Sequence, residues 1–358
     1  MSQPLLLVGT TKGLFAYHSD ASRNEWSLGE PLLPGWEISS VGIIDRGDGQ
    51  RPRLIVGTVH YAYGATLRLS DDLGKTWRQI EQGPAYSAES GFKLNRIWQV
   101  CQHPTEKETI FAGVDEAGLF ISGDMGETWS EIDSLTKLPS RPKWFAGGGG
   151  LCLHTIVVDR TNASRWWIGI SAVGFYRTTD AGQTWTACNH GLGDLPTGSN
   201  EEDAVHCIHK FVQHPTKPDT LFMQYHGGVY RTDNAGDTWT SIEKGLPGNF
   251  GFPIVIANDG TMCVVPLDGE TTRGFFSGNA VVYRSTDEGA SWTGITNGLP
   301  ADKNFAGVLR DAMTSDREKQ TGFYFGTTMG QVFASADAGA SWRRLPGELP
   351  RVLSVRTI

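Results

Sequence analysis

The apolar residues of this chain fall into short runs separated by turn-forming residues, and stripes with a helical period are absent. Typical runs are Leu5–Thr10, Ile97–Cys101 and Thr109–Val114, which are rich in β-branched and aromatic side chains. Turns containing Gly, Pro, Asn and Asp follow such runs, as is typical of β-strands. No run approaches the roughly 18 apolar residues that a membrane helix needs. The pattern therefore predicts an all-β protein.

An eight-residue phrase, Ser/Thr-x-Asp-x-Gly-x-Thr/Ser-Trp, occurs six times between Ser70 and Trp342, and a degenerate copy ends at Trp26. The tryptophans that close these phrases are spaced by 50 to 56 residues: Trp26, Trp77, Trp129, Trp185, Trp239, Trp292 and Trp342. A repeat of this length indicates propeller blades. We therefore predict a seven-bladed β-propeller of four-stranded antiparallel blades, forming one domain over residues 1–358.

One repeat, from Ile97 to Ile132, predicts the four strands of a blade. They are Ile97–Cys101, Thr109–Val114, Gly118–Ser122 and Thr128–Ile132. The N-terminal repeat starts instead with what corresponds to a second strand, and Arg351–Arg356 resembles a lone first strand. We expect the C-terminal strand to complete the N-terminal blade, which would remove the open sheet edges.

The repeated phrase lies between the third and fourth strands of each repeat, where a structural role in the turn is expected. Its Asp can accept backbone N–H groups, its Gly can adopt a positive φ, and its Trp can pack beside the blade. The copy that begins at Thr232 has Asn234 in place of Asp. Because Asn also forms such turns, this substitution favours an architectural role over a charge-dependent one.

Composition and charge narrow the classes of partner. The formal net charge is -8 and no Lys/Arg-rich stripe is present, which argues against nucleic-acid and membrane-surface partners. The first eight residues lack the basic start and long apolar core of a signal peptide. The five cysteines have no metal-type or disulfide-type spacing, so a cytoplasmic protein with free thiols is expected.

Polar and aromatic residues are concentrated in the loops of one predicted face, opposite the repeated phrases. Loops held on a rigid scaffold commonly carry function. Acid/base hydrolysis needs two carboxyl groups flanking a bond, one of them with a raised pKa. The candidate catalytic carboxyl groups are those of Asp115, Glu89, Glu116 and Glu202.

The same loops and adjoining strands provide candidate ligand-binding side chains of three kinds. Arginine and lysine can bind an anionic group, histidine can form hydrogen bonds, and aromatic rings can stack on a sugar. These candidates are Tyr61, Arg96, Trp98, His154, His209, Lys210, His226 and Arg310, and further possible stacking platforms are Trp36, Trp144, Phe250 and Phe252.

Four histidines from different repeats form a candidate divalent-metal site, since imidazoles can converge where several blades meet. They are His60, His154, His209 and His226. The alternative is that these histidines separately bind loop backbone, because no local spacing such as His-Glu-x-x-His supports a metal.

The repeated phrases resemble the Asp-box, or bacterial neuraminidase repeat, and the resemblance covers essentially the whole chain. This resemblance implies a β-propeller. The chain is also similar to single-domain bacterial propellers labelled glycosyl hydrolase or sialidase. Sialidases have six blades, an Arg-Ile-Pro motif near the start, three arginines and a Tyr/Glu pair; here seven repeats and no Arg-Ile-Pro occur. Xyloglucan-cleaving glycosidases of this kind use two propellers, whereas only one is expected here, so neither subtype is carried over.

These observations lead to three functional hypotheses. The first is a propeller that binds a small polar ligand, a carbohydrate by preference, in a pocket on its axis, with or without hydrolysing it. The second is a non-catalytic propeller that binds a protein partner through the same loops. The third is a metal-dependent enzyme that uses the four histidines.

Overall fold

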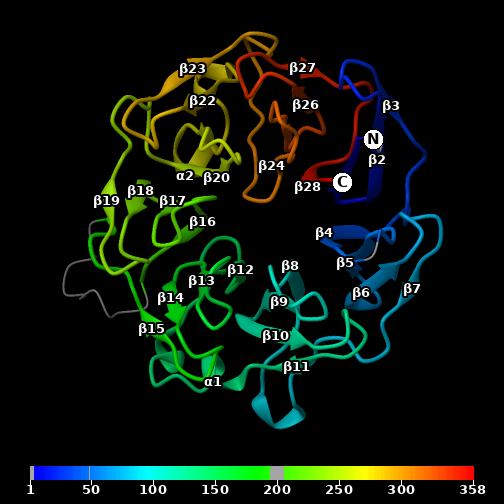
Figure 1. The fold of residues 1–358 in the computed structure, drawn as a ribbon, viewed down its shortest axis with the longest axis vertical. Helices are drawn as coiled ribbons and strands as arrows, with labels where there is room; N and C mark the ends of the chain where they lie inside the picture. Colours follow the sequence, from blue (N-terminus) through cyan, green and yellow to red (C-terminus); the bar gives the residue numbers. More distant parts are fainter. Residues whose placement is uncertain (1–3, 48, 194–204) are drawn as a thin grey trace. The chain divides into compact units, whose positions relative to one another are not determined.

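The computed structural model describes residues 4–47, 49–193 and 205–358. These residues form seven antiparallel sheets of four strands each, as labelled in Figure 1. The protein is a seven-bladed β-propeller, as the repeat predicted. The described residues divide into two compact units.

The first unit comprises the described residues 4–35, 209–235 and 239–358. Its four sheets have the strand orders β28-β1-β2-β3, β16-β17-β18-β19, β20-β21-β22-β23 and β24-β25-β26-β27. The strands are β1 (Leu5–Thr10), β2 (Gly13–Ser19), β3 (Trp26–Leu28), β16 (Ile208–Gln213), β17 (Leu221–Tyr225), β18 (Gly228–Thr232), β19 (Thr240–Ser241), β20 (Gly251–Ile256), β21 (Met262–Pro266), β22 (Val282–Ser285), β23 (Thr293–Ile295), β24 (Met313–Ser315), β25 (Phe323–Gly326), β26 (Val332–Ser335), β27 (Arg343–Arg344) and β28 (Val352–Thr357).

The second unit comprises the described residues 36–47, 49–193, 205–208 and 236–238. Its three sheets have the orders β4-β5-β6-β7, β8-β9-β10-β11 and β12-β13-β14-β15. The strands are β4 (Glu37–Ile44), β5 (Arg53–His60), β6 (Gly64–Ser70), β7 (Arg78–Gln79), β8 (Arg96–Gln102), β9 (Ile110–Asp115), β10 (Gly118–Ser122), β11 (Ser130–Glu131), β12 (Leu153–Val158), β13 (Trp166–Ile170), β14 (Gly174–Thr178) and β15 (Thr186–Ala187).

Within the part of the chain that the structure describes, helix is confined to single turns in the connecting loops. They are α1 (Asp133–Thr136), α2 (Gly269–Thr272) and the 3-10 turns η1 (Ala88–Ser90), η2 (Arg141–Lys143) and η3 (Phe276–Gly278). Among the residues described, no helix has the length and apolar character needed to span a membrane.

The two ends of the chain share one sheet, as predicted. β28 pairs antiparallel with β1, with Leu6 opposite Thr357 and Val8 opposite Val355. All six residues of β1 are buried, which explains its uninterrupted apolar run. The C-terminal strand therefore covers backbone groups of β1 that would otherwise form a free sheet edge.

The strand boundaries within a blade match the prediction closely, with one exception. The third strand, β10, has the predicted bounds Gly118–Ser122. The fourth strand was predicted as Thr128–Ile132 but is reduced to Ser130–Glu131 in β11. At the start of the strand, the N–H of Thr128 donates to Asp124 Oδ1 within the turn, whereas at its end the N–H of Ile132 still donates to the Leu119 carbonyl of β10.

The turn that begins at Ser70 shows the role of the repeated phrase. The N–H of Gly74 donates to Ser70 Oγ at 2.8 Å, and the N–H of Thr76 donates to Asp72 Oδ1 at 2.9 Å. Trp77 Nε1 donates to the Gly74 carbonyl at 2.9 Å, and Gly74 has a φ of 87°. Hydrogen bonds from Thr76 lower the pKa of Asp72 to about 2. The predicted architectural role is confirmed for this turn.

The first strands of the sheets carry β-bulges that the sequence did not reveal. The pairing register shifts in β4, β8, β12, β20 and β28. In β8 and β12 the shift falls at Trp98 and His154, respectively. A bulge turns a side chain out of the regular alternation. Two residues predicted from sequence as binding residues therefore lie where their direction depends on a local irregularity.

Candidate functional site

Four rings form an aromatic shelf beside the β5–β6 turn: Trp36 and His60, which are half-buried, and Tyr61 and Tyr63, which are exposed. The ring centroid of His60 lies 4.9 Å from Trp36, 4.5 Å from Tyr61 and 4.9 Å from Tyr63. Trp36 and Tyr63 are near-parallel, with centroids 6.0 Å apart. Tyr61 is 97% exposed and Tyr63 70% exposed, so this surface presents unusually large apolar rings to solvent.

Local structure accounts for the position of the aromatic shelf. The N–H of Tyr63 donates to the His60 carbonyl at 3.2 Å, and Gly64 turns the chain with a φ of 71°. This short turn joins β5 to β6 and places two tyrosines outside the sheet. Trp36 directly precedes β4, and the Arg68 guanidinium lies 4.1 Å from its ring centroid. The cation holds the Trp36 ring in place through a cation–π contact.

Next to Trp36 in sequence, Glu37 begins a polar cluster centred on Arg96. Arg96 Nη2 lies 2.7 Å from Glu37 Oε1, and its guanidinium lies 5.1 Å from the Trp98 ring centroid. Across the β8–β9 ladder, Arg96 is paired with Asp115. The predicted binding residues Arg96 and Trp98 and the predicted catalytic residue Asp115 therefore lie together.

Asp115 has the electrostatic character expected of an acid. Burial raises the pKa of the Asp115 carboxyl above its ordinary value, although hydrogen bonds from Asn95 and Trp98 and the charge of Arg96 act in the opposite direction. Gly150 lies so close that a Cβ there would be 2.5 Å from Asp115 Oδ2. Glycine at this position allows the loop backbone to cover the carboxyl and remove it from water.

The other three carboxyl groups predicted to be catalytic lack the surroundings of Asp115 or lie outside the described residues. Glu89 is exposed in η1. Glu116 follows Asp115 and is half-buried, and its N–H donates to the Lys93 carbonyl at 2.9 Å. Glu202 lies outside the described residues. Of the three candidates within the described residues, Asp115 is the one that combines burial with a neighbouring cation.

A second group of predicted residues lies in the first unit, around His209. His209 Nδ1 lies 2.5 Å from the Gly251 carbonyl, and its ring contacts Phe250 and Phe252 at centroid distances of 5.4 and 4.8 Å. His226 lies edge-on to His209 at 5.3 Å, and its Nε2 is 2.9 Å from Glu270 Oε2. Two of the four histidines predicted to bind a metal are therefore neighbours.

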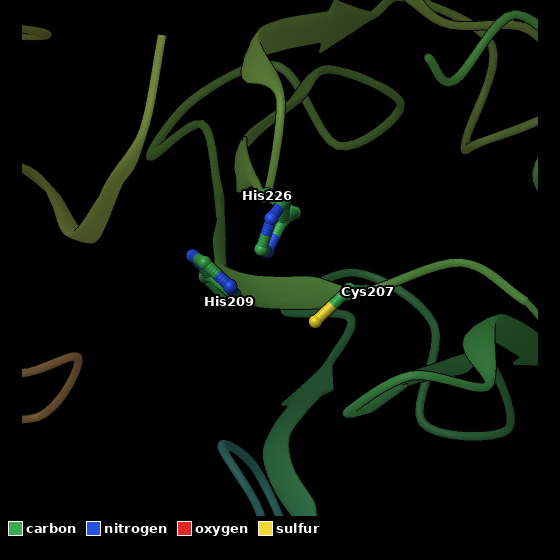
Figure 2. A group of neighbouring side chains, drawn as sticks. All are labelled: Cys207, His209 and His226. Carbon is green, nitrogen blue, oxygen red and sulfur yellow. The ribbon is translucent and has the colours of Figure 1, made fainter. Parts of the chain in front are cut away.

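Cys207 joins these two histidines. One ligand atom from each of Cys207, His209 and His226 lies within 4.8 Å of the others, and Figure 2 shows the three side chains together. The other two predicted metal ligands are placed differently. Buried His154 lies 2.9 Å from Thr155 Oγ1 through Nδ1 and 2.9 Å from the Ile208 carbonyl through Nε2, and His60 belongs to the aromatic shelf.

Lys210 and Arg310, predicted to bind ligand, are tied to protein groups. Lys210 Nζ and Arg356 Nη2 each lie 2.8 Å from Asp311 Oδ1, and Arg310 Nε donates to the His209 carbonyl at 3.2 Å. Burial lowers the pKa of Lys210. Burial alone would raise the pKa of Asp311, but the charges of Lys210 and Arg356 hold it below its ordinary value. We call Lys210, Asp311 and Arg356 the Asp311 network.

Sequence reasoning missed three residues that the structure brings into these groups: Glu37, Tyr63 and Cys207. Tyr63 was detectable, since it shares the His60–Tyr63 turn with Tyr61. Cys207 was also detectable, because residues two apart on an extended strand face the same side, and His209 follows at that spacing. Nothing in the sequence pairs Glu37 with Arg96.

No family model matches the chain. Its curated relatives include three xyloglucan-degrading enzymes. The oligoxyloglucan-reducing end-specific xyloglucanase of Emericella nidulans is 20% identical over 316 residues, which is 78% of this chain and 37% of that protein. A xyloglucanase of Paenibacillus sp is 25% identical over 73% of this chain and 27% of its own length. A xyloglucanase of Hypocrea jecorina is 27% identical over 79% of this chain and 36% of its own length.

Solved structures show the same fold at low identity. The GH74 enzyme of Niastella koreensis aligns with a TM-score of 0.65 and 18% identity over 96% of this chain and 52% of that one. A Lactobacillus plantarum protein aligns with a TM-score of 0.62 and 11% identity over 100% of both chains. The structure of YCF48 bound to D1 peptide aligns with a TM-score of 0.55 and 14% identity over 96% of this chain and 86% of that one.

The xyloglucanase relatives and the seven sheets together fit a glycosyl hydrolase-like propeller. The chain spans about a third of the length of the curated relatives that it matches, between 27 and 37% for the three named above. The relation is thus to one part of larger enzymes.

Proposed function

We propose that this protein binds an oligosaccharide on the aromatic shelf and hydrolyses it with Asp115 as the general acid. The observation that carries the proposal is the series of links between these groups, by sequence from Trp36 to Glu37 and by contact or strand pairing from Glu37 to Asp115. Trp36 of the shelf is followed by Glu37, Glu37 pairs with Arg96, and Arg96 lies opposite Asp115 in the β8–β9 ladder. The similarity to xyloglucanases supports an oligoxyloglucan as the ligand to test first. We also assign the repeated turns to the Asp-box type.

The chemistry divides between two carboxyl groups. Asp115, whose pKa is raised by burial, would in its protonated form give its proton to the glycosidic oxygen as the bond to the anomeric carbon breaks. Glu37, held by Arg96, would accept a proton from the water that attacks the anomeric carbon. Flat apolar faces of sugar rings would stack on Trp36, Tyr61 and Tyr63, which positions the bond to be cleaved.

The test is binding and hydrolysis of oligoxyloglucans by the Tyr61→Ala/Tyr63→Ala double variant. Loss of two stacking rings should weaken binding by about 1–3 kcal/mol, or roughly 5- to 150-fold. Both rings are exposed, so the free energy of unfolding should stay within about 0.5 kcal/mol of the original. Isothermal titration calorimetry and urea unfolding give the two quantities.

Phe305→Ala is the matched control, because Phe305 is 72% exposed but lies in the first unit, outside the shelf. It should bind oligosaccharide normally. Equal affinity of the double variant and the original would overturn the proposed binding site.

A protein-binding propeller is the second candidate, since exposed tyrosines are also enriched at protein interfaces. The structure of YCF48 bound to D1 peptide, which is similar to this chain in fold, contains such a peptide partner. This candidate predicts no oligosaccharide binding by the unaltered chain. Measurable oligosaccharide affinity that depends on Tyr61 and Tyr63 would decide against it.

A further inference from the structure

Arg68 belongs to the β5–β6 hairpin that carries the aromatic shelf. In the ladder of this hairpin, His60 lies opposite Gly64 and Val56 lies opposite Arg68, with no shift of register between them. Because side chains separated by an even number of residues on a strand point to the same side, Arg68 and His60 share one face of the sheet. The Arg68 guanidinium lies 4.1 Å from the Trp36 ring centroid, so it directly adjoins the shelf.

Arg68 has no carboxylate partner among the residues that the structure describes. Its Nε is buried and has no hydrogen-bond acceptor. Burial lowers the pKa of the Arg68 guanidinium, and no carboxylate of the described residues offsets this effect. A charge removed from water is costly unless an opposite charge or hydrogen bonds compensate it. The Trp36 ring supplies only part of that compensation, through the attraction of its face for a cation.

Arg53, on the neighbouring strand β5, shows the contrasting case of an arginine that is satisfied within the chain. Its Nε lies 2.8 Å from Asp71 Oδ1, and its Nη1 lies 2.9 Å from Glu127 Oε1. Burial acts to lower the pKa of Arg53, but the hydrogen bonds and charges of these two carboxylates raise it above its ordinary value. Arg68 is half-buried beside exposed rings, and its positive charge is not neutralised by any described residue.

We propose that the oligosaccharide bound on the aromatic shelf is acidic and that Arg68 binds its carboxylate or phosphate group. This inference rests on the proposed function, because it assumes that sugar rings stack on the shelf. A guanidinium matches either group with two parallel N–H bonds, and since Nε is covered, the two terminal nitrogens of Arg68 would donate them. Trp36 lies between this cation and the near-parallel ring of Tyr63 in the series of contacts. An acidic oligosaccharide would therefore bind more tightly than a neutral oligoxyloglucan.

The experiment compares neutral cellobiose, cellobiouronic acid and cellobiose 6′-phosphate by isothermal titration calorimetry at pH 7. Each acidic probe differs from cellobiose in one charged group on the terminal sugar. We expect an acidic probe to bind about tenfold more tightly than cellobiose, because hydrogen bonds between charged groups are the strong ones, and the tighter of the two identifies the group. Equal affinities for all three probes would overturn this proposal and leave the proposed function standing. Binding of none of them would overturn both.

Arg68→Met removes the charge but keeps a side chain that packs on Trp36, so the ratio of acidic to neutral affinity should fall to about one. Arg78→Met is the matched control, because Arg78 lies on β7 of the same sheet and is paired with Glu127; it should keep the ratio. If Arg68 only held the Trp36 ring, Arg68→Met would weaken all probes equally, and that unchanged ratio would refute the proposal. Arg68→Lys serves if Arg68→Met does not fold. It should lower the ratio several-fold, since lysine lacks the planar fork, and an unchanged ratio would again contradict the assignment.

Discussion

The aromatic shelf and the Asp311 network each contain a residue that the sequence predicted to bind ligand, Tyr61 and Lys210, respectively. The two groups differ in whether their side chains are exposed or already paired within the chain. In the network, Lys210 and Arg356 share Asp311 Oδ1 at 2.8 Å each, and the Asp311 side chain is only 5% exposed. In the shelf, Tyr61 and Tyr63 remain open to solvent and contact mainly other rings. Interactions completed within the chain contribute stability, whereas large exposed rings are available to a ligand.

This difference shows why residue type alone misplaced part of the site. Lys210 and Arg310 were predicted to bind ligand because cations can bind carboxylates or phosphates. The structure gives Lys210 a carboxylate from its own chain and ties Arg310 to the His209 backbone. Tyr61, in contrast, has the exposure that a binding residue needs.

The largest expected effect is on stability, from Asp311→Asn. The change leaves Lys210 and Arg356 buried without their shared anion, and breaking a buried ion pair from one side typically costs about 3–5 kcal/mol. Urea unfolding measures the loss in free energy of unfolding. Adding Lys210→Met should cost less than the sum of the two single changes, because one stranded cation is then gone.

The pH dependence of the same variant provides a check. The lowered pKa of Asp311 means that its contribution is present above the ordinary pKa of about 3.9 and is lost as the pH falls toward the folded-state pKa. The stability difference between the original protein and Asp311→Asn should therefore shrink below about pH 4. A difference that does not change with pH would show that Asp311 is not ionised in the network.

Asp115→Asn should separate stability from activity. Because burial raises the pKa of Asp115, the ionised carboxyl is unfavourable in the folded protein, and the contribution of this group is lost as the pH rises through its folded-state pKa. The variant should unfold at a higher temperature than the original at pH 7, with the gain vanishing below about pH 4. Thermal unfolding followed by circular dichroism at several pH values measures this.

The same change should abolish hydrolysis of oligoxyloglucans while leaving their binding largely intact, since a general acid contributes to the rate. In the original protein the rate should fall as the pH rises above the pKa of Asp115, because the acid is then deprotonated. Full activity of Asp115→Asn would remove Asp115 from the catalytic role.

The smallest expected effect on stability comes from Glu37→Gln. The Glu37–Arg96 pair is partly exposed, with side chains 24% and 30% accessible, so its loss should cost no more than about 1 kcal/mol. Turnover should nevertheless be lost, because an amide cannot accept the proton of the attacking water. Glu81→Gln, which changes an exposed glutamate outside this cluster, is the matched control and should keep turnover. Unchanged turnover of Glu37→Gln would show that Glu37 is not the second carboxyl group of the reaction.

The sequence predicted the blades well because the information is local. The phrase from Ser70 to Trp77 carries its own hydrogen bonds, and its repetition marks each sheet. Even the pairing of β28 with β1 was predictable, since the first repeat lacks a strand and the last segment supplies one. Local repetition did not reveal the bulges at Trp98 and His154, which redirect side chains within otherwise regular strands.

By itself, then, the sequence determined the all-β class, the number of blades, the turn chemistry and the shared sheet of the two termini. Only the tertiary structure decided which side chains are partners. Lys210 meets Asp311 across 101 residues of sequence, and Arg356 meets it across 45. The physical reason is that a repeat specifies backbone pairing within each sheet. Which charged groups and thiols lie next to each other depends on packing between segments that no local pattern connects.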